Sequence, residues 1–243
     1  MTAGTLYGIG VGPGDPELIT VKALRRLQAA PVVAFPAGRQ GQMGVAQRAI
    51  AAWLTPEQTQ LPLYFPYVQD SNALAQAWQQ AAETVWPYLA HGQHVVFASE
   101  GDISFYSTFT YLAQSLQQAH PEAQIEAIPG VCSPLAAAAV LGIPLTIQAQ
   151  RLAVIPALYR VSDLETVLVW ADVLVLLKVS SVYRDVWQIL HQHQLLQRSY
   201  IVQRATTDQQ IVYADLGKYP DLQLPYFSLL IVQVRQGVEG REL

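Results

Sequence analysis

Glycine is dense near the start of the chain, where residues 8–15 read GIGVGPGD. A Rossmann dinucleotide loop needs a third glycine three positions after the second, and this position holds Pro13 or Asp15, depending on the starting glycine. A P-loop is also excluded, because no Gly-Lys-Ser/Thr follows. Two interpretations remain: a side-chain-poor turn that lets a ligand approach the backbone, or a plain strand–helix connection.

The histidines and the single cysteine offer little for metal or nucleophilic chemistry. Only His191 and His193 lie close together, and positions two apart do not share a helix face. Cys132 has no histidine near it in the sequence to activate its thiol, which favours a small packing residue over a nucleophile. We therefore expect neither a metal site nor thiol catalysis.

Composition narrows the class of protein. The chain has 243 residues, of which 51% are hydrophobic and 13% charged, so a sizeable core is available. The net charge of −4 comes without a basic block, which argues against a nucleic-acid partner. No apolar run is long enough for a membrane span, and no signal-peptide pattern is visible at the start. One cysteine rules out an intramolecular disulfide and fits a reducing compartment, so we expect a cytoplasmic protein.

Strand-like apolar runs alternate with helical patterns, which predicts an α/β fold. In the first half, a helix is expected to start at Asp15-Pro16, where Asp15 can cap it. The expected strands there are 5–10, 31–35, 94–98 and 124–128, and the further expected helices are 43–54, 73–89, 105–116 and 132–141.

A second set of elements follows a candidate domain boundary at 143–151. Its expected strands are 152–155, 173–177, 200–203, 210–214 and 228–234, and its expected helices are 163–170 and 182–191. The sequence thus predicts two domains, 1–146 and 147–243. Ligand clefts favour domain interfaces, so we expect a site between the two.

Six segments resemble, in order, the motifs of the tetrapyrrole (corrin/porphyrin) methylases. They are GIGVGPGDPEL at 8–18, SEGDISFYST at 99–108, IPGVCS at 128–133, LLKV at 176–179, QRATTDQQI at 203–211, and PYFS at 225–228 followed by LLIV. The combination of GDISFYSTF, LLKV and PYFSLLIV resembles the branch that methylates C20 of precorrin-2 or cobalt-factor II. The segment 63–67 (LYFPY) also resembles that branch, with Tyr67 where methionine is usual. Cys132-Ser133 replaces the usual pair of serines.

This resemblance implies two α/β domains with mixed sheets, unlike a Rossmann fold, and a cofactor held in the cleft between them. It implies S-adenosylmethionine as the cofactor, with S-adenosylhomocysteine as product, and a homodimer. The implied activity is C20 methylation in cobalamin biosynthesis. The residue that removes the C20 proton stays unknown.

The resemblance also implies a set of cofactor contacts: Pro13, Glu100, Gly101, Asp102, Phe105, Thr108, Cys132, Ser133, Lys178, Ala205 and Ser228. Each has a structural alternative. Asp102 could instead cap a helix that starts at Ile103. Lys178 could extend to solvent from the end of a strand, and Ser228 could be an ordinary sheet residue. Ala205 stands where relatives often have glycine.

The implied substrate is a flat macrocycle with many carboxylate arms. Arginine binds carboxylates through two parallel N–H donors, and aromatic rings can stack on the macrocycle. The candidates are Arg39, Arg151, Arg184 and Arg204 for the carboxylates, and Tyr67 and Tyr106, with Tyr64, for stacking. A solvated or packing role is the alternative for each. Any cobalt would arrive with the substrate.

Methyl transfer from a sulfonium is an in-line displacement with a neutral thioether as leaving group. The protein's tasks are then to align the reactants and to exclude water. Three other readings stay open at this point: a different ring position, a protein acceptor, and a non-catalytic protein that binds a small ligand.

Overall fold

The computed structural model describes residues 2–235 except 39–41, 67, 69, 159 and 161. The predicted substrate residues Arg39 and Tyr67 therefore lie outside the described residues. The chain divides into two compact units, Met1–Ser133 and Pro134–Leu243. Within the described residues, none of the helices combines the length and the apolar character that crossing a bilayer requires.

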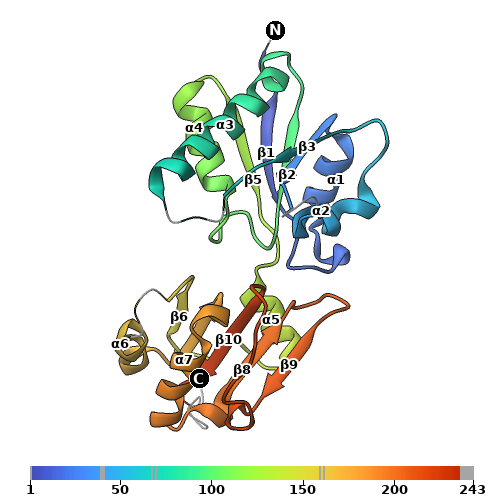
Figure 1. Ribbon diagram of the computed structural model, residues 1–243. Helices are drawn as coiled ribbons and strands as arrows, with labels where there is room; N and C mark the ends of the chain where they lie inside the picture. Colours follow the sequence, from blue (N-terminus) through green and yellow to red (C-terminus); the bar gives the residue numbers. More distant parts are fainter. Residues whose placement is uncertain are drawn as a thin grey trace. The chain divides into compact units, whose positions relative to one another are not determined.

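The first unit is built on a five-stranded sheet (Figure 1). Its strands are β1 (Thr5–Gly10), β2 (Val32–Pro36), β3 (Thr59–Leu63), β4 (Val95–Ser99) and β5 (Gln124–Ile128), in the order β3-β2-β4-β1-β5. All pairings in this sheet are parallel. The expectation of a mixed sheet is therefore corrected for this unit. Buried on both faces, β1, β2 and β4 read as nearly continuous apolar runs.

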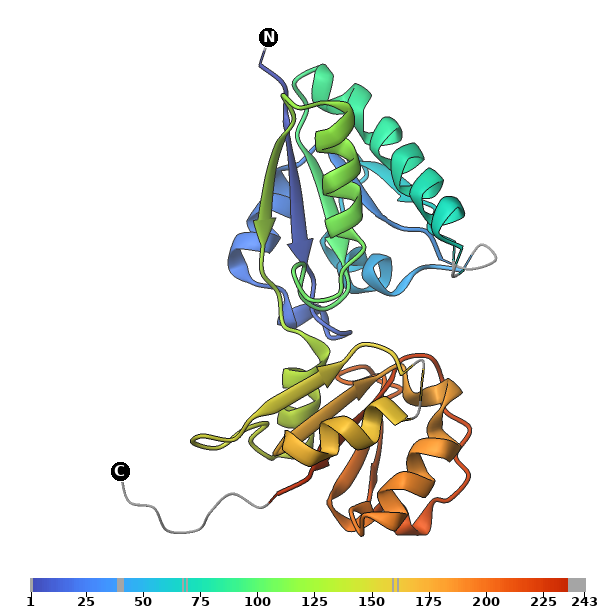
Figure 2. The same cartoon turned by 90° about the vertical axis from the view of Figure 1, so that its left-hand side faces the viewer.

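Helices cover both faces of this sheet, as Figure 2 shows from the side. Leu27 of α1 (Val21–Ala29) and Ile50 of α2 (Val45–Ile50) pack on one face, and α2 is continued by the 3₁₀ turn Ala51–Trp53. The opposite face carries α3 (Ser71–Ala90) and α4 (Phe109–Ala119) through residues such as Leu89 and Leu112. The connections from β1 to β2 and from β2 to β3 run one way along the sheet, and those from β3 to β4 and from β4 to β5 run the other way. Right-handed crossovers then require helices on opposite faces.

Local capping sets where the helices of the first unit begin. Asp15 caps the short 3₁₀ turn Pro16–Leu18 by accepting from the Glu17 N–H at 2.8 Å, as predicted. The helix proper starts only at Val21, where the Thr20 hydroxyl accepts from Ala23 N–H. The sequence does not predict strand β3, because TQLPL begins with two polar residues and contains a proline. An edge strand tolerates both.

The second unit is built on a mixed sheet in the order β6-β7-β10-β8-β9. The strands are β6 (Leu152–Ile155), β7 (Val173–Leu177), β8 (Ser199–Gln203), β9 (Ile211–Ala214) and β10 (Ser228–Gln233). Only β6 and β7 pair in parallel, and the other pairings are antiparallel. The prediction of two α/β domains is thus confirmed, and the mixed character is found in this unit.

Helices also cover both faces of the second sheet. Helices α6 (Ser162–Trp170) and α7 (Tyr183–Gln192) pack on one face through Leu164, Leu168 and Leu190. Short 3₁₀ turns connect the remaining elements at Val179–Ser181, Leu196–Arg198 and Leu216–Lys218.

The other face carries α5 (Ser133–Leu141), whose Ala137 and Ala138 lie against Val175 and Ile231. Because the small side chains of α5 pack on the second sheet, this helix belongs to the second unit. The division therefore falls at 133/134, earlier than the predicted boundary at 146/147.

Candidate functional site

Three loops of the first unit meet at the carboxyl edge of its sheet. The loop after β1 and the loop after β4 form a two-way backbone bridge, with Gly12 N donating to Gly101 O at 3.2 Å and Gly101 N donating to Gly12 O at 2.8 Å. Val11 N also donates to Ser99 O at 2.9 Å. The glycine-rich turn is therefore hydrogen-bonded to a second loop, and it is more than a plain strand–helix connection.

The Asp102 carboxylate ties in the third loop, which follows β5. One of its oxygens accepts from Ser104 N at 2.8 Å, and the other accepts from Gly130 N at 2.8 Å. Helix α4 starts at Phe109 and not at residue 105, so Asp102 does not cap it. Both the predicted helix start and the capping alternative are corrected. Asp102 instead holds the loop after β4 to the loop after β5.

Glycines allow these loops to approach closely. A Cβ on Gly10 would lie 2.6 Å from Gly101 O and 2.7 Å from Gly130 N, and a Cβ on Gly130 would lie 2.5 Å from Gly101 O. No side chain fits at either position without moving the backbone.

Gly101 differs, because the nearest atoms to its ideal Cβ position are Val131 O at 3.9 Å and Cys132 Cα at 4.0 Å. Its φ of +71° is readily adopted only by glycine. A Cβ at Gly101 would therefore make ordinary van der Waals contact with the loop after β5 and would not clash with it. The glycine is selected here by its backbone conformation.

Sheet topology favours a ligand at this edge. From the neighbouring strands β1 and β4, the chain leaves toward helices on opposite faces, α1 and α4. Such a switch point opens a crevice at the carboxyl ends of parallel strands, where ligands of open α/β sheets bind. Seven of the predicted cofactor residues are in the three loops: Pro13, Glu100, Gly101, Asp102, Phe105, Thr108 and Cys132. An eighth, Ser133, begins α5 directly after the third loop.

A buried pair of serines fixes the end of the loop after β4. The Ser99 and Ser107 hydroxyl oxygens lie 2.9 Å apart, and Ser107 Oγ also accepts from Phe109 N at 3.2 Å. Tyr106, just before this anchor, has a φ of +54° and leaves 56% of its surface exposed. A left-handed tyrosine is uncommon and marks a position where the backbone is strained.

In the second unit, three predicted residues share one edge of the sheet. Lys178 follows the last residue of β7, Ala205 follows β8, and Ser228 begins β10, the strand that pairs with both. Arg204 N donates to Phe227 O at 2.8 Å, which holds the β8 loop beside the start of β10. The structure therefore brings Lys178, Ala205 and Ser228 together with the predicted substrate residue Arg204.

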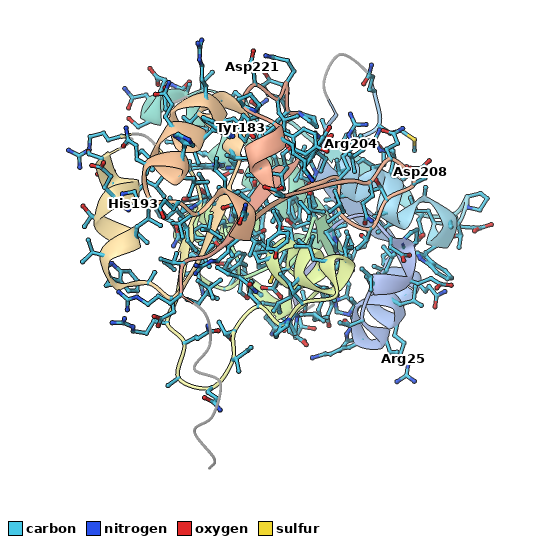
Figure 3. The ribbon with its side chains drawn as sticks, turned by 90° about the horizontal axis from the view of Figure 1, so that it is seen from below. Arg25, Tyr183, His193, Arg204, Asp208 and Asp221 are labelled. Atoms are coloured by element: carbon cyan, nitrogen blue, oxygen red, sulfur yellow. The ribbon has the colours of Figure 1, made fainter. Side chains whose placement is uncertain are left out.

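Non-glycine residues with positive φ gather at the same edge. The φ angles of Lys178, Arg204 and Thr206 are 54°, 44° and 68°. The ammonium of Lys178 lies 5.7 Å from the centroid of the Tyr226 ring. The Arg204 guanidinium donates to Gln209 within the loop after β8. Arg204 and Asp208 of this loop are labelled in Figure 3. Strained residues cluster at functional sites more often than elsewhere, so this edge is a second candidate surface.

Ser228 is nevertheless fixed by the fold itself. Its hydroxyl donates to Pro225 O at 2.7 Å, and the residue is 3% exposed. This contact agrees with the structural alternative for the side chain.

Arg151 does not join these residues. It precedes β6, at the end of the sheet opposite to Lys178, because β6 and β7 are parallel. Its backbone N–H and its Nε donate to Asp172 Oδ2 at 2.8 and 3.1 Å, and Arg235 donates to the other carboxylate oxygen at 3.2 Å. Arg151 thus has a structural contact at this end of the sheet, and its part in substrate binding stays a prediction.

The Asp172 network makes a pH-dependent prediction. The pKa of the Asp172 carboxyl lies below its ordinary value of 3.8. The main cause is the hydrogen bond from the Arg151 backbone N–H, and the hydrogen bond from the Arg151 side chain is the next largest. A depressed pKa stabilises the fold above the ordinary value, and the gain disappears as pH falls through the folded pKa. Asp172→Asn should therefore lower the melting temperature at pH 7, and its difference from wild type should shrink below pH 4. A thermal series from pH 7 to pH 2.5 measures this, and a difference that grew on acidification would contradict it.

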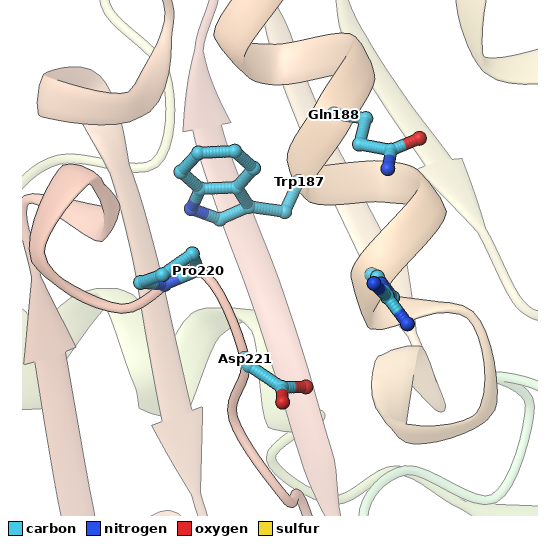
Figure 4. A pocket seen from close by; sticks show the side chains of 5 residues that line it. Trp187, Gln188, Pro220 and Asp221 are labelled. Carbon is cyan, nitrogen blue, oxygen red and sulfur yellow. The ribbon is translucent and has the colours of Figure 1, made fainter.

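Arg184, in the first turn of α7, lines a shallow pocket of about 220 Å³. Figure 4 shows Trp187 projecting from the helix toward Pro220 on the chain before β10, and Gln188 and Asp221 also line the pocket. None of the predicted cofactor residues lines this pocket.

Sequence reasoning missed Gly10, Gly130, Ser99 and Ser107 as site residues. The two glycines stood in quoted motifs, but only the tertiary contact between the loops reveals that they touch. The serine pair carries no local signal, because its members come from a strand end and from a loop.

With this geometry in hand, comparisons with known proteins identify the class. The sequence profile of the tetrapyrrole (corrin/porphyrin) methylases matches residues 5–219. The chain belongs to this family. A crystal structure of uroporphyrin-III C-methyltransferase from Thermus thermophilus, complexed with S-adenosylhomocysteine, has the same fold, with a TM-score of 0.68 and 23% identity over 94% of this chain and 92% of that one.

Curated relatives lie close in sequence. The precorrin-2 C(20)-methyltransferase of a Sinorhizobium species is 32% identical over 94% of this chain and 95% of its own length. The cobalt-precorrin-2 C(20)-methyltransferase of Salmonella typhimurium is 33% identical over 94% and 96%. The chain spans about half the length, 46%, of the cobalamin biosynthesis protein CobIJ of Mycobacterium tuberculosis, to which it is 34% identical.

Proposed function

We propose that this chain transfers a methyl group from S-adenosylmethionine to C20 of precorrin-2 or of its cobalt complex, in cobalamin biosynthesis. The observation that carries the proposal is the set of three loops joined at Gly12, Gly101, Asp102 and Gly130, at a sheet edge suited to a ligand. The names of the two full-length relatives support the choice of substrate.

The residues of the first unit would hold the cofactor mainly through the backbone. Because Gly10, Gly12, Gly101 and Gly130 carry no side chains, a ligand could contact the backbone of these loops directly. The bound cofactor supplies an electrophilic methyl group on sulfur. The loops keep that group in a fixed place because Asp102 and the Gly12–Gly101 bridge lock them together, and fixed placement is the main contribution a protein makes to such a displacement.

The cationic residues of the second unit would meet the anionic parts of the ligands. Lys178 and Arg204 lie on either side of the start of β10. Carboxylates are bound well by such groups, and both the cofactor and a tetrapyrrole carry them. We propose that Lys178, Ala205 and Ser228 contribute to cofactor binding and that Arg204 contributes to substrate binding.

Lys178→Ala should weaken S-adenosylhomocysteine binding about tenfold, because a charge-assisted hydrogen bond contributes roughly 1.5–3 kcal/mol. Lys218→Ala is the matched control, since Lys218 pairs with Asp215 in the same unit at 3.5 Å. Isothermal titration calorimetry of both variants measures the effect. Equal affinities would remove Lys178 from the proposed site.

Titration of the wild-type chain with S-adenosylhomocysteine tests the cofactor assignment. Binding in the micromolar range is expected for a product of this kind, corresponding to about −8 kcal/mol. A chain that does not bind it is not a methyltransferase of this type. Binding without methylation of any tetrapyrrole would instead favour a protein acceptor or a non-catalytic role.

We further propose a cytoplasmic homodimer. The proposal rests on the resemblance to the family and on the single cysteine, which suits a reducing compartment. Sedimentation velocity should give one species near twice 26.7 kDa, and a species of 26.7 kDa across micromolar concentrations would contradict it.

A further inference from the structure

Exposed apolar side chains are distributed unevenly over the first unit. In the part of that unit which the structure describes, the exposed large apolar residues are Val21, Met43, Tyr64, Val68, Tyr106 and Tyr111. Each lies in a loop that leaves the carboxyl end of a strand or in the first helical turn after it. This edge of the sheet is therefore the apolar one, and the amino-terminal edge is not.

Tyr106 stands out within this set. Its backbone is left-handed, with a φ of +54°, and its ring lies edge-on to Phe105 with centroids 4.7 Å apart. Glycine or asparagine would satisfy the same turn at lower cost. The next residue, Ser107, is anchored through the buried pair with Ser99, so the loop has no freedom to relax the strain. A costly, exposed aromatic ring in a fixed loop points to contact with a ligand.

Tyr106 is also close to the proposed cofactor position along the chain. It is separated from Gly101 by few residues, and an extended chain spans at most about 3.6 Å per residue. A ring at this place can reach a substrate that meets the cofactor beside Gly101. The hydroxyl end of tyrosine tolerates water while the ring contacts a flat apolar face.

We propose that Tyr106 stacks on the face of the tetrapyrrole and sets the affinity for that substrate, and that its left-handed backbone is retained for this contact. The inference rests on the proposed function, because it needs a flat macrocycle as substrate. It assigns to Tyr106 a contact with the methyl acceptor and none with the cofactor.

Substitutions of Tyr106 separate the effect of its strained backbone from the effect of its aromatic ring. Tyr106→Gly should raise the melting temperature, since glycine adopts this φ freely, and should raise KM for cobalt-precorrin-2 at least tenfold. The affinity for S-adenosylhomocysteine should stay within twofold of wild type. Tyr106→Phe keeps the ring and should restore KM to within about threefold. Gln194→Gly is the matched control: Gln194 is exposed, has a φ of +57°, and follows α7, so the variant should gain stability with no change in KM.

Three results would overturn the inference: an unchanged KM in Tyr106→Gly, an equal loss of S-adenosylhomocysteine affinity, or a lower melting temperature in Tyr106→Gly. A wild-type chain that methylates no tetrapyrrole would instead contradict the proposed function. The two failures are thus distinguished by the wild-type reaction.

Discussion

Gly130→Ala is expected to lower the affinity for S-adenosylhomocysteine at least 100-fold. The new Cβ would lie 2.5 Å from Gly101 O and 2.6 Å from the Gly10 carbonyl carbon, well inside any contact distance. The clash falls on backbone atoms, so the loops after β1, β4 and β5 must separate, and such overpacking costs about 1–3 kcal/mol. A 100-fold loss corresponds to about 2.7 kcal/mol. Calorimetric titration of the folded variant measures it.

Gly4→Ala is the matched control for this clash. Its Cβ would lie 1.9 Å from Gln93 O, again a backbone atom of the first unit, but before the amino end of β1. Both variants should lose stability, and only Gly130→Ala should lose affinity in its folded fraction.

A second pair of variants, with smaller steric effects, tests the same claim if Gly130→Ala and Gly4→Ala fail to fold. Gly101→Ala and Gly92→Ala have similar φ angles of +71° and +79°, and neither Cβ comes closer than 3.5 Å to a neighbour. Both should lose about 1 kcal/mol of stability. Only Gly101→Ala should weaken S-adenosylhomocysteine binding. Equal affinities within each pair would mean that the three loops do not form the cofactor site.

Asp102→Ala should have the second largest effect, with roughly 30-fold weaker S-adenosylhomocysteine binding and a clear loss of stability. The change removes two hydrogen bonds to a carboxylate, from Ser104 N and Gly130 N, which contribute about 2 kcal/mol or more together. Asp102→Asn should rescue only part of the loss, because its NH₂ group would face a backbone N–H. The readouts are a denaturant titration and the same calorimetric titration.

Asp70→Ala provides the control for Asp102. The Asp70 carboxylate caps α3 by accepting from Ala73 N at 2.7 Å, so its loss should cost about 1 kcal/mol of stability. Its substitution should leave ligand affinity unchanged. If Asp102→Ala behaved like Asp70→Ala, Asp102 would be a stabilising turn residue with no part in the site.

Periodicity and turn chemistry predicted most of the fold. Strands such as Thr5–Gly10 and Val173–Leu177 lie where their apolar runs predict them, because a strand that is buried on both faces is made almost entirely of apolar residues. The first residues of the helices were predicted less accurately than the strands. The segment from Phe105 looked helical by pattern, yet the left-handed Tyr106 and the turn at Asp102 delay α4 to Phe109. Tertiary contacts between loops overrode local preference there.

The ordered motifs singled out segments around Gly12, Gly101 and Gly130 that the structure brings into contact. The sequence could not show that Asp102 joins two of these loops, because its partner Gly130 lies far along the chain. The residue type of Arg151 suits a carboxylate ligand, while the parallel register of β6 and β7 places it beside Asp172, at the end of the sheet opposite to Lys178. Its part in substrate binding stays a prediction.

The central claim is methylation at C20. The most direct test incubates the purified chain with S-adenosylmethionine carrying a ¹³C-labelled methyl group, and with either precorrin-2 or cobalt-precorrin-2, and then locates the label by NMR. We expect one new methyl carbon bound to C20 of at least one of the two substrates. Label at another ring carbon, or no transfer to either tetrapyrrole from a chain that binds S-adenosylhomocysteine, would contradict this account.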